Sequence, residues 1–276
     1  MSCISEDAFV NGILRDNSPV IVTDAMTTWK ALDQWTPNYF RSKHGEKAVL
    51  VYDDLFKLIG VSDLASYLGR NFNQPASSPT KEYVRAYARF KDVDFIWSDD
   101  LFEAVADDWD CPYFFPKRGF ALPCKAADAE VSPVRDPFPY KGLFISGRGA
   151  RTRLHRDPFC TDAMLCQFHG EKRLIFYEPH LAAQLMNGTN FVDPLNVDAE
   201  LFPDFTGPAP VFDDVLRPGE MLFIPGGWFH DIFTLSDSIS ITWNFVHDSC
   251  AERYRRELDN LANDFDRDML AYLGCV

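Results

Sequence analysis

The second half of the chain contains six short segments that most constrain the fold. Each is rich in β-branched or aromatic residues, and turn residues such as Gly and Pro separate it from the next. Several short strands broken by such turns are typical of a β-sandwich or a jelly roll. The predicted strands cover residues 141–146, 163–168, 172–177, 221–224, 228–233 and 238–246.

The regions on either side of these strands have a different pattern. The first 70 residues combine a short apolar strand at 19–22 with helical segments at 36–44 and 62–68, each of which begins with a Ser or Thr that can cap it. Residues 249–273 carry apolar side chains at steps of three and four, which predicts a helix that packs on the body or on a second copy of the chain. We therefore expect one domain of three parts, 1–140, 141–247 and 248–276.

Charge and composition exclude some classes of protein. The chain has 27 Lys and Arg against 41 Asp and Glu, a net charge of −14, which argues against a surface built to bind nucleic acid. No signal peptide pattern and no apolar run long enough to span a membrane is present, and the seven cysteines form no Cys-x-x-Cys pair. These features predict a soluble intracellular protein with reduced thiols, in the cytoplasm, with the nucleus left open.

Two of the six histidines lie in patterns that suggest a metal site. His155 and Asp157 are two residues apart, so on a strand their side chains would project from the same face. His230 follows an apolar strand and a Gly-Gly turn, which would deliver one polar side chain into aromatic surroundings. Two His and one carboxylate on one face of a metal are the ligands of mononuclear Fe(II) oxygenases, although a satisfied core histidine is the usual alternative for any single His.

Four linked motifs resemble the JmjC-domain, cupin-like oxygenases that use 2-oxoglutarate. They occur in the expected order, and an upstream segment with Trp29 and Trp35 is similar to the N-terminal region of the small hydroxylases of that family. The resemblance therefore covers most of the chain. The motifs are TRLHRDP at 152–158, QFHGEKR at 167–173, PGEMLFIPGGWFH at 218–230 and ISITWNF at 239–245.

The resemblance implies a double-stranded β-helix with flanking helices, in which His155, Asp157 and His230 hold Fe(II) and the cosubstrates are 2-oxoglutarate and O₂. In family members a Lys and a Thr bind the distal carboxylate of 2-oxoglutarate, and an Asn lies near it. The matching residues are Thr152, Lys172 and Asn244, and a looser match adds Tyr83, which as an ordinary strand aromatic would have no such role.

Physical arguments accompany two of these assignments. A Lys on an apolar strand is costly to bury unless it meets an anion, although the pattern alone favours an exposed strand end for Lys172. The resemblance implies the anion-binding role instead. On the last strand Asn244 and Thr242 share the polar face, which would line a pocket or face solvent, and for Thr242 both alternatives remain open. Some relatives carry an Asn where this chain has 163–165 (AML), so the contacts to 2-oxoglutarate should differ in detail.

We expect an oxygenase that hydroxylates a peptide, a protein side chain or an amino-acid-like substrate. The alternatives are an N-methyl demethylase or an RNA-base hydroxylase of the same family, or a cupin-like protein that binds without turnover. A basic cluster beside the metal motif would contact an anionic substrate or form salt bridges, and Cys160 and Cys166 are interpreted as packing residues. The cluster consists of Arg148, Arg151, Arg153 and Arg156.

Overall fold

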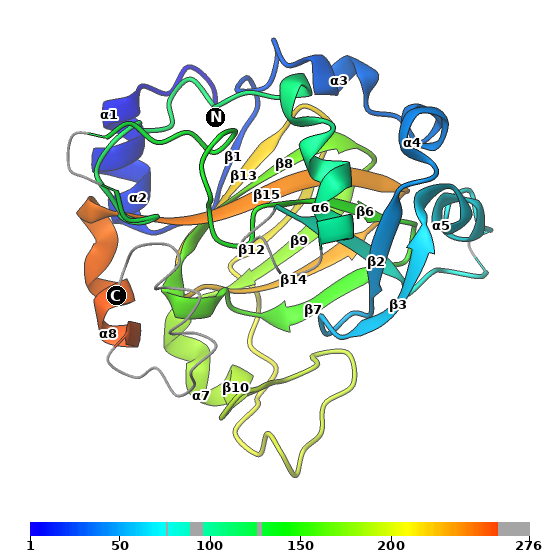
Figure 1. The fold of residues 1–276 in the computed structure, drawn as a ribbon. Helices are drawn as coiled ribbons and strands as arrows, with labels where there is room; N and C mark the ends of the chain where they lie inside the picture. The colour runs from blue at the N-terminus through cyan, green and yellow to red at the C-terminus, as the bar shows by residue number, and fades with distance from the viewer. Residues whose placement is uncertain (76, 89–95, 126–128, 259–276) are drawn as a thin grey trace.

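The computed structural model describes residues 1–75, 77–88, 96–125 and 129–258, and two antiparallel sheets dominate it (Figure 1). The larger sheet follows the order β1-β13-β8-β15-β6-β4-β2-β3, and β5 attaches to β15. Its strands are β1 (Val20–Val22), β2 (Ala48–Tyr52), β3 (Leu58–Asp63), β4 (Tyr83–Tyr87), β5 (Phe120–Leu122), β6 (Gly142–Ser146), β8 (Asp162–His169), β13 (Met221–Ile224) and β15 (Ser238–His247).

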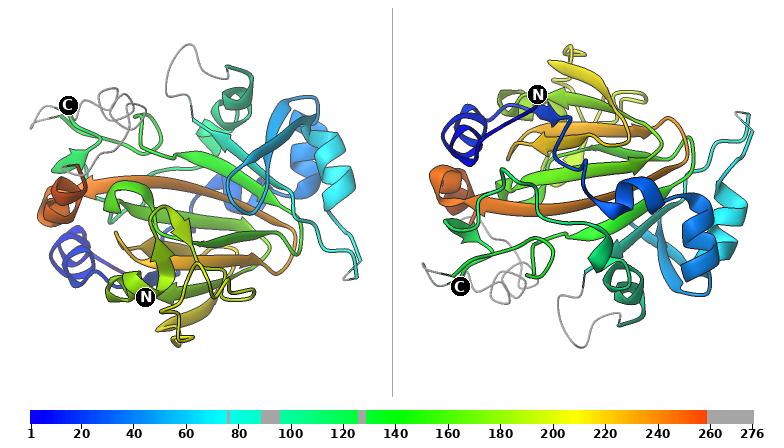
Figure 2. Two further views of the ribbon diagram at one scale, coloured as in Figure 1. Left: turned by 90° about the horizontal axis from the view of Figure 1, so that it is seen from below. Right: turned by 90° about the horizontal axis from the view of Figure 1, so that it is seen from above.

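The smaller sheet has the order β12-β9-β14-β7 and faces the larger one (Figures 1 and 2). The sequence prediction of a jelly-roll core with flanking helices is confirmed, and the six predicted strands correspond to β6, β8, β9, β13, β14 and β15. The four strands are β7 (Arg151–His155), β9 (Lys172–Tyr177), β12 (Phe212–Leu216) and β14 (Phe229–Thr234). A long excursion between β9 and β12 contains the small hairpin β10 (Met186–Asn187) and β11 (Asn190–Phe191), and it projects beyond the smaller sheet (Figure 1).

Short helices flank the sheets. Thr36 caps the predicted helix at 36–44, because its side chain accepts a hydrogen bond from the backbone of Tyr39. The helix predicted at 62–68 begins later, because Ser62 pairs in β3 and the carboxylate of Asp63 takes the capping position. The helices are α1 (Glu6–Ala8), α2 (Leu14–Asp16), α3 (Lys30–Gln34), α4 (Pro37–His44), α5 (Leu64–Asn71), α6 (Ile96–Glu103), α7 (Ala182–Leu185) and α8 (Ala251–Leu258), with a π-helical turn at Phe9–Ile13 and 3₁₀ turns at Ala106–Asp108, Pro158–Cys160, Pro179–Leu181 and Asp248–Cys250.

Strand alternation separates the two largest apolar clusters of the interior. On β15, Ile239, Ile241, Trp243 and Phe245 join the largest core, which they share with the N-terminal helices on the outer side of the larger sheet. Residues of neighbouring strands that point the other way, such as Leu165 of β8, pack between the two sheets. The inner faces of the two sheets therefore enclose a space that apolar side chains fill only in part.

The larger sheet extends across the boundary that the sequence suggested at residue 140. From the N-terminal part, β1 pairs with β13 and β4 pairs with β6. The first 140 residues thus contribute strands as well as helices, and β4 brings its side chains to the same space between the sheets.

The C-terminal segment begins as predicted, with α8. Its Tyr254 is buried against Leu122, Phe159 and Val246 of the same chain. The remainder of the predicted helix lies outside the described residues, so the dimer expected from its apolar stripe stays a prediction. None of the helices in the described ranges is long and apolar enough to cross a membrane.

Candidate functional site

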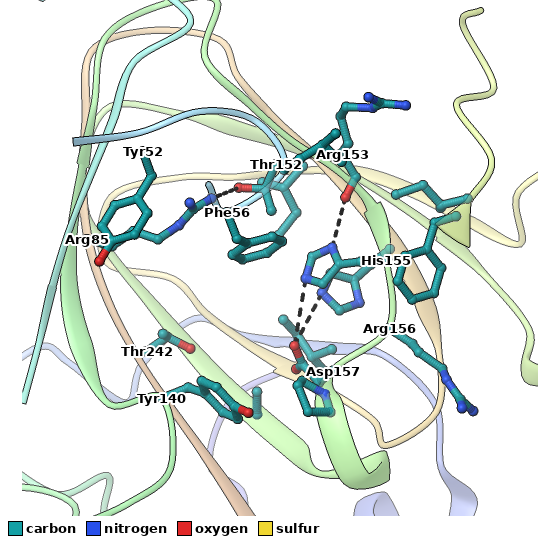
Figure 3. A pocket seen from close by; sticks show the side chains of 18 of the residues that line it. Tyr52, Phe56, Arg85, Tyr140, Thr152, Arg153, His155, Arg156, Asp157 and Thr242 are labelled. Carbon is teal, nitrogen blue, oxygen red and sulfur yellow. Dashed lines mark hydrogen bonds and ion pairs between the residues drawn. The ribbon is translucent and has the colours of Figure 1, made fainter. Parts of the chain in front are cut away.

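A cavity of about 1360 Å³ opens between the two sheets (Figure 3). Strands of both sheets line it, together with the loop after β2 and the excursion between β9 and β12. All eight residues that the sequence singled out lie in or beside this cavity. Seven of them line it, namely Thr152, His155, Asp157, Lys172, His230, Thr242 and Asn244, and the eighth, Tyr83, contacts Lys172.

His155, Asp157 and His230 form one group in which each residue offers a ligand atom within 4.8 Å of the others. The Oδ1 atom of Asp157 lies 3.8 Å from Nε2 of His155 and 3.9 Å from Nε2 of His230. Two imidazole nitrogens and one carboxylate oxygen, converging on one point from one side, match the donor set of a mononuclear Fe(II) centre. The residues present therefore fit the metal that the resemblance implies.

Strand pairing explains why the two histidines meet. His155 and His230 are direct partners in the antiparallel pair β7–β14, and their ring centroids lie 4.2 Å apart. His155 and Asp157 do not lie on one strand, because β7 ends at His155. Asp157 nevertheless has an extended backbone (φ −64°, ψ 143°), which keeps its side chain on the side of His155.

Backbone carbonyls orient both imidazole rings. Nδ1 of His155 lies 2.9 Å from the carbonyl oxygen of Arg153, and Nδ1 of His230 lies 3.2 Å from that of Trp228. A carbonyl oxygen only accepts hydrogen bonds, so both Nδ1 atoms carry the hydrogen and both Nε2 atoms present a lone pair to the metal position. Burial and the neighbouring His230 ring hold the pKa of His155 well below its usual range, which favours the neutral ligand form.

A β-bulge in β7 brings a fourth residue to the cavity. His230 pairs with His155 and Ile232 pairs with Thr152, so two steps along β14 correspond to three steps along β7. Residues three apart on a regular strand face opposite sides of the sheet. The bulge allows Thr152 and His155 to line the same cavity.

Lys172 lies inside the protein, with 1% of its surface exposed. Its Nζ donates to the hydroxyl of Tyr83 at 2.7 Å and to Oγ of Ser240 at 2.9 Å, and no carboxylate of the described chain lies within ion-pair distance. Burial by itself would raise the pKa of Tyr83, but the charges of Lys172 and Arg85 outweigh this effect and lower it. A buried ammonium with only hydroxyl partners is poised for an anion.

The polar face of β15 points into the cavity and not to solvent. Thr242 and Asn244 both line it. The hydroxyl of Thr242 donates to the carbonyl oxygen of Met164 at 2.8 Å, and Nδ2 of Asn244 donates to Oγ1 of Thr161 at 2.9 Å. Ala163 and Leu165, from the segment where some relatives carry an Asn, give the cavity an apolar wall.

Among the described residues, Arg151 and Arg153 of the basic cluster form salt bridges. Arg151 pairs with Asp231 and Asp193, and Arg153 pairs with Asp193. These contacts attach the excursion between β9 and β12 to the strands that carry the histidines. Arg148 instead donates to the backbone of Gln74. Of the two cysteines interpreted as packing residues, Cys166 is buried in the large core, and Cys160 lies against the turn at Gly226.

Sequence reasoning missed a cation and two aromatic rings in the cavity. Arg85 lines it from β4, with Tyr52 at the end of β2 and Phe56 in the loop that follows. A signal for Arg85 was present, because it lies two residues after Tyr83 and a strand places both on one face. Phe56 gave no signal, because a loop has no side-chain period.

Comparisons with known proteins agree with this geometry. A family model described as a cupin-like domain matches residues 6–251. An arginine-specific demethylase, JMJ20 of Arabidopsis thaliana, is 24% identical over 88% of this chain and 55% of its own length. The 2-oxoglutarate and iron-dependent oxygenase JMJD4 of Mus musculus is 24% identical over 87% of this chain and 58% of its own length. The tRNA wybutosine-synthesizing protein 5 of Danio rerio is 22% identical, over 88% of this chain and 73% of its own length.

The chain thus spans little more than half the length of the first two of these relatives. The family model, in contrast, covers both sheets and every residue of the candidate site. The resemblance drawn from the four motifs is confirmed, and the chain belongs to the family of cupin-like domains.

Proposed function

We propose that the protein is an Fe(II)- and 2-oxoglutarate-dependent oxygenase that hydroxylates a peptide, a protein side chain or an amino-acid-like substrate. One observation carries the proposal: the cavity that contains His155, Asp157 and His230 also contains Lys172, a buried cation without a carboxylate partner among the described residues. A metal and a dicarboxylate can therefore be held in one enclosed space. The names of the relatives include an iron- and 2-oxoglutarate-dependent oxygenase, which supports the same reading.

The residues have separate roles in this proposal. His155, Asp157 and His230 would hold Fe(II), which supplies oxidative chemistry with 2-oxoglutarate and O₂ when bound. Lys172 and Thr152 would bind the distal carboxylate of 2-oxoglutarate, with help from Tyr83.

Asn244 and Thr242 would contact the cosubstrate from β15.

Aromatic rings cover the histidines and would limit the access of water to them. Phe176 stacks on His230 at 5.4 Å between centroids, and Phe56 lies edge-on to His155 at 4.9 Å.

The test is succinate release from 2-oxoglutarate by anaerobically iron-loaded protein after O₂ is admitted. We expect iron-dependent succinate from the wild type and at least a 100-fold loss in His155→Ala, since each lost ligand removes more than the ~10–100-fold that outer-shell changes cost. His180→Ala is the matched control, because the His180 side chain is 69% exposed and lies outside the cavity. Equal succinate from wild type and His155→Ala would refute the ligand assignment.

Further measurements separate the alternatives. Formaldehyde released together with succinate from an N-methylated substrate would identify a demethylase, which is what the name of the Arabidopsis relative describes. If the wild type releases no succinate, detectable 2-oxoglutarate binding keeps the enzyme reading. The absence of both turnover and binding favours the non-catalytic binding protein.

A further inference from the structure

Arg85 is a second buried cation of the cavity, and nothing in the proposed reaction uses it. Its residue exposure is 1%. The guanidinium carbon lies 4.2 Å from the ring centroid of Phe56, 4.7 Å from that of Tyr83 and 5.5 Å from that of Tyr52. Three aromatic faces thus fix the position of a permanent positive charge at the cavity wall.

The hydrogen bonds of Arg85 leave this charge uncompensated. Nη2 donates to Oγ1 of Thr152 at 3.3 Å and Nη1 donates to the carbonyl oxygen of Asp53 at 3.4 Å, both long contacts with neutral groups. Within the described ranges no carboxylate lies within ion-pair distance of Arg85, whereas Arg151 of β7 pairs with two. A guanidinium has five N–H donors, and burying it without an anion is costly. An anionic ligand would compensate the charge of this buried guanidinium.

The inference rests on the proposed function, in which the cavity binds Fe(II) and 2-oxoglutarate. Counting the charges of that complex indicates which anion Arg85 would bind. Asp157 and the keto-acid carboxylate of 2-oxoglutarate offset the two charges of Fe(II), and the distal carboxylate offsets Lys172. Of the two almost completely buried cations that line the cavity, Lys172 and Arg85, it is Arg85 that then has no anion within the described ranges. We propose that Arg85 binds a single carboxylate of the substrate, so that the substrate class is a carboxylic acid.

Arg85 borders the cosubstrate end through Thr152 and Tyr83, but its nearest aromatic ring, that of Phe56, lies on the opposite side, toward the cavity mouth. Lys172 contacts Tyr83 and Ser240, which are almost completely buried, whereas the ring stacked on Arg85, Phe56, is 41% exposed at the cavity mouth. Phe56 also contacts the His155 ring, and Figure 3 shows it between Arg85 and His155. A group bound by Arg85 therefore lies on the entry side of the cavity and close to a metal ligand, where a substrate must lie.

Thr152 lies between the two anion positions. Its Oγ1 accepts from Arg85, so its own hydroxyl hydrogen is available to donate to the cosubstrate. The carboxylate could belong to a small free acid or to an Asp, Glu or C-terminus of a peptide. The planar fork of the guanidinium recognises the carboxylate in the same way in each case.

The experiment measures ligand binding to protein loaded anaerobically with Fe(II) and the inert analogue N-oxalylglycine. One arm uses the twenty N-acetyl amino acids, each as the free acid and as its carboxamide. A second arm uses the capped, amidated tripeptides Gly-Asp-Gly and Gly-Glu-Gly with their Asn and Gln counterparts. We expect at least one acid to bind at least about tenfold more tightly than its amide, the ratio that a charged hydrogen-bond pair supports.

Arg85→Met should abolish this preference while changing the affinity for N-oxalylglycine by less than about threefold. Arg85→Lys keeps the charge, so it should retain part of the preference and stands in if Arg85→Met does not fold. Arg118→Met is the matched control, because the Arg118 side chain is 59% exposed, and it should behave as the wild type.

Three results would overturn the inference. The first is a wild type that shows no preference for acids over amides in either arm. The second is an Arg85→Met variant that retains the preference. Alternatively, Arg85→Met would weaken N-oxalylglycine as strongly as Lys172→Met, which would assign Arg85 to the cosubstrate. A wild type that fails to bind N-oxalylglycine at all is a separate result, because it refutes the proposed function and the inference together.

Discussion

At one end of the cavity, the three side chains that meet lie on two paired strands or directly after one of them, and two of the three are separated by a single residue. At the other end, Tyr83, Thr152, Lys172 and Ser240 come from four different strands. The metal end thus lies within one sheet, whereas the cationic end exists only when the two sheets have assembled. The pair His155 and Asp157 can be recognised as a motif, its meeting with His230 depends on the register of one strand pair, and the cationic end depends on both sheets.

The largest expected effect contrasts two buried aspartates. Asp157→Ala removes one of the three proposed ligands, so iron affinity should fall by more than about 100-fold while the fold is kept. Asp162→Ala should leave the ligand set intact but lower the free energy of unfolding by about 2–4 kcal/mol, because Asp162 accepts hydrogen bonds from the backbone of Gly226 and from Arg253. Metal titration and denaturant unfolding of both variants measure the two quantities. If both variants lost stability equally, the distinction between the ligand and the structural carboxylate would be wrong.

The next effect tests the cationic end alone. Lys172→Met should weaken N-oxalylglycine binding by about 2–3 kcal/mol, or roughly 30- to 150-fold, since the distal carboxylate loses its partner. Binding of 2-oxobutyrate, which lacks that carboxylate, should not change. The unliganded protein should lose no stability, because Lys172 has no carboxylate partner among the described residues. Calorimetry with both keto acids checks the prediction, and an equal loss for the two would contradict it.

A smaller effect is expected from Tyr83→Phe. The hydroxyl accepts from Lys172 at 2.7 Å, so its removal should cost about 1 kcal/mol, or roughly fivefold in affinity for N-oxalylglycine. Tyr87→Phe provides the comparison, because Tyr87 lies on the same face of β4 but makes no contact with Lys172. Identical affinities of the two variants would show that the hydroxyl of Tyr83 does not position Lys172.

The smallest effect is expected for Thr242→Val. The hydroxyl hydrogen already goes to the carbonyl of Met164, so the substitution should cost about 1 kcal/mol of stability or less. Affinity for N-oxalylglycine should change by less than about threefold. A change as large as that of Tyr83→Phe would mean that Thr242 is a principal contact of the cosubstrate.

The sequence predicted those parts of the fold that depend on side-chain period. Six strands, β6, β8, β9, β13, β14 and β15, were predicted from their composition and the turns between them, whereas β7 and β12 were not. On β15 the predicted alternation is found, because the apolar residues enter the large core while Thr242 and Asn244 line the cavity. By contrast, the predicted start of α5 was wrong. Ser62 and Asp63 can both cap a helix, and only the pairing of β3 with β2 decides between them.

The candidate site was likewise predictable only where a local sequence pattern determines it. The spacing of His155 and Asp157 suggested a chelating pair, but their meeting with His230 follows from strand register. Arg85 could be placed on the face of Tyr83, yet its aromatic partner Phe56 lies in a loop and its hydrogen-bond partner Thr152 lies on the opposite sheet. Contacts between residues so far apart in the chain are not contained in any local pattern.

The β-bulge in β7 ties the arrangement of the cavity to the shape of one strand. Thr152 and His155 face inward together although they are three residues apart, because one extra residue lies between them relative to β14. Losing one residue between them would leave them two apart, the spacing at which regular alternation places both on one face. Straightening the strand at unchanged length would instead turn one of them outward. In the evolution of this family, the loss of one codon here would therefore keep the proposed iron-binding and cosubstrate-binding residues on one face, whereas a substitution that removes the bulge would separate them.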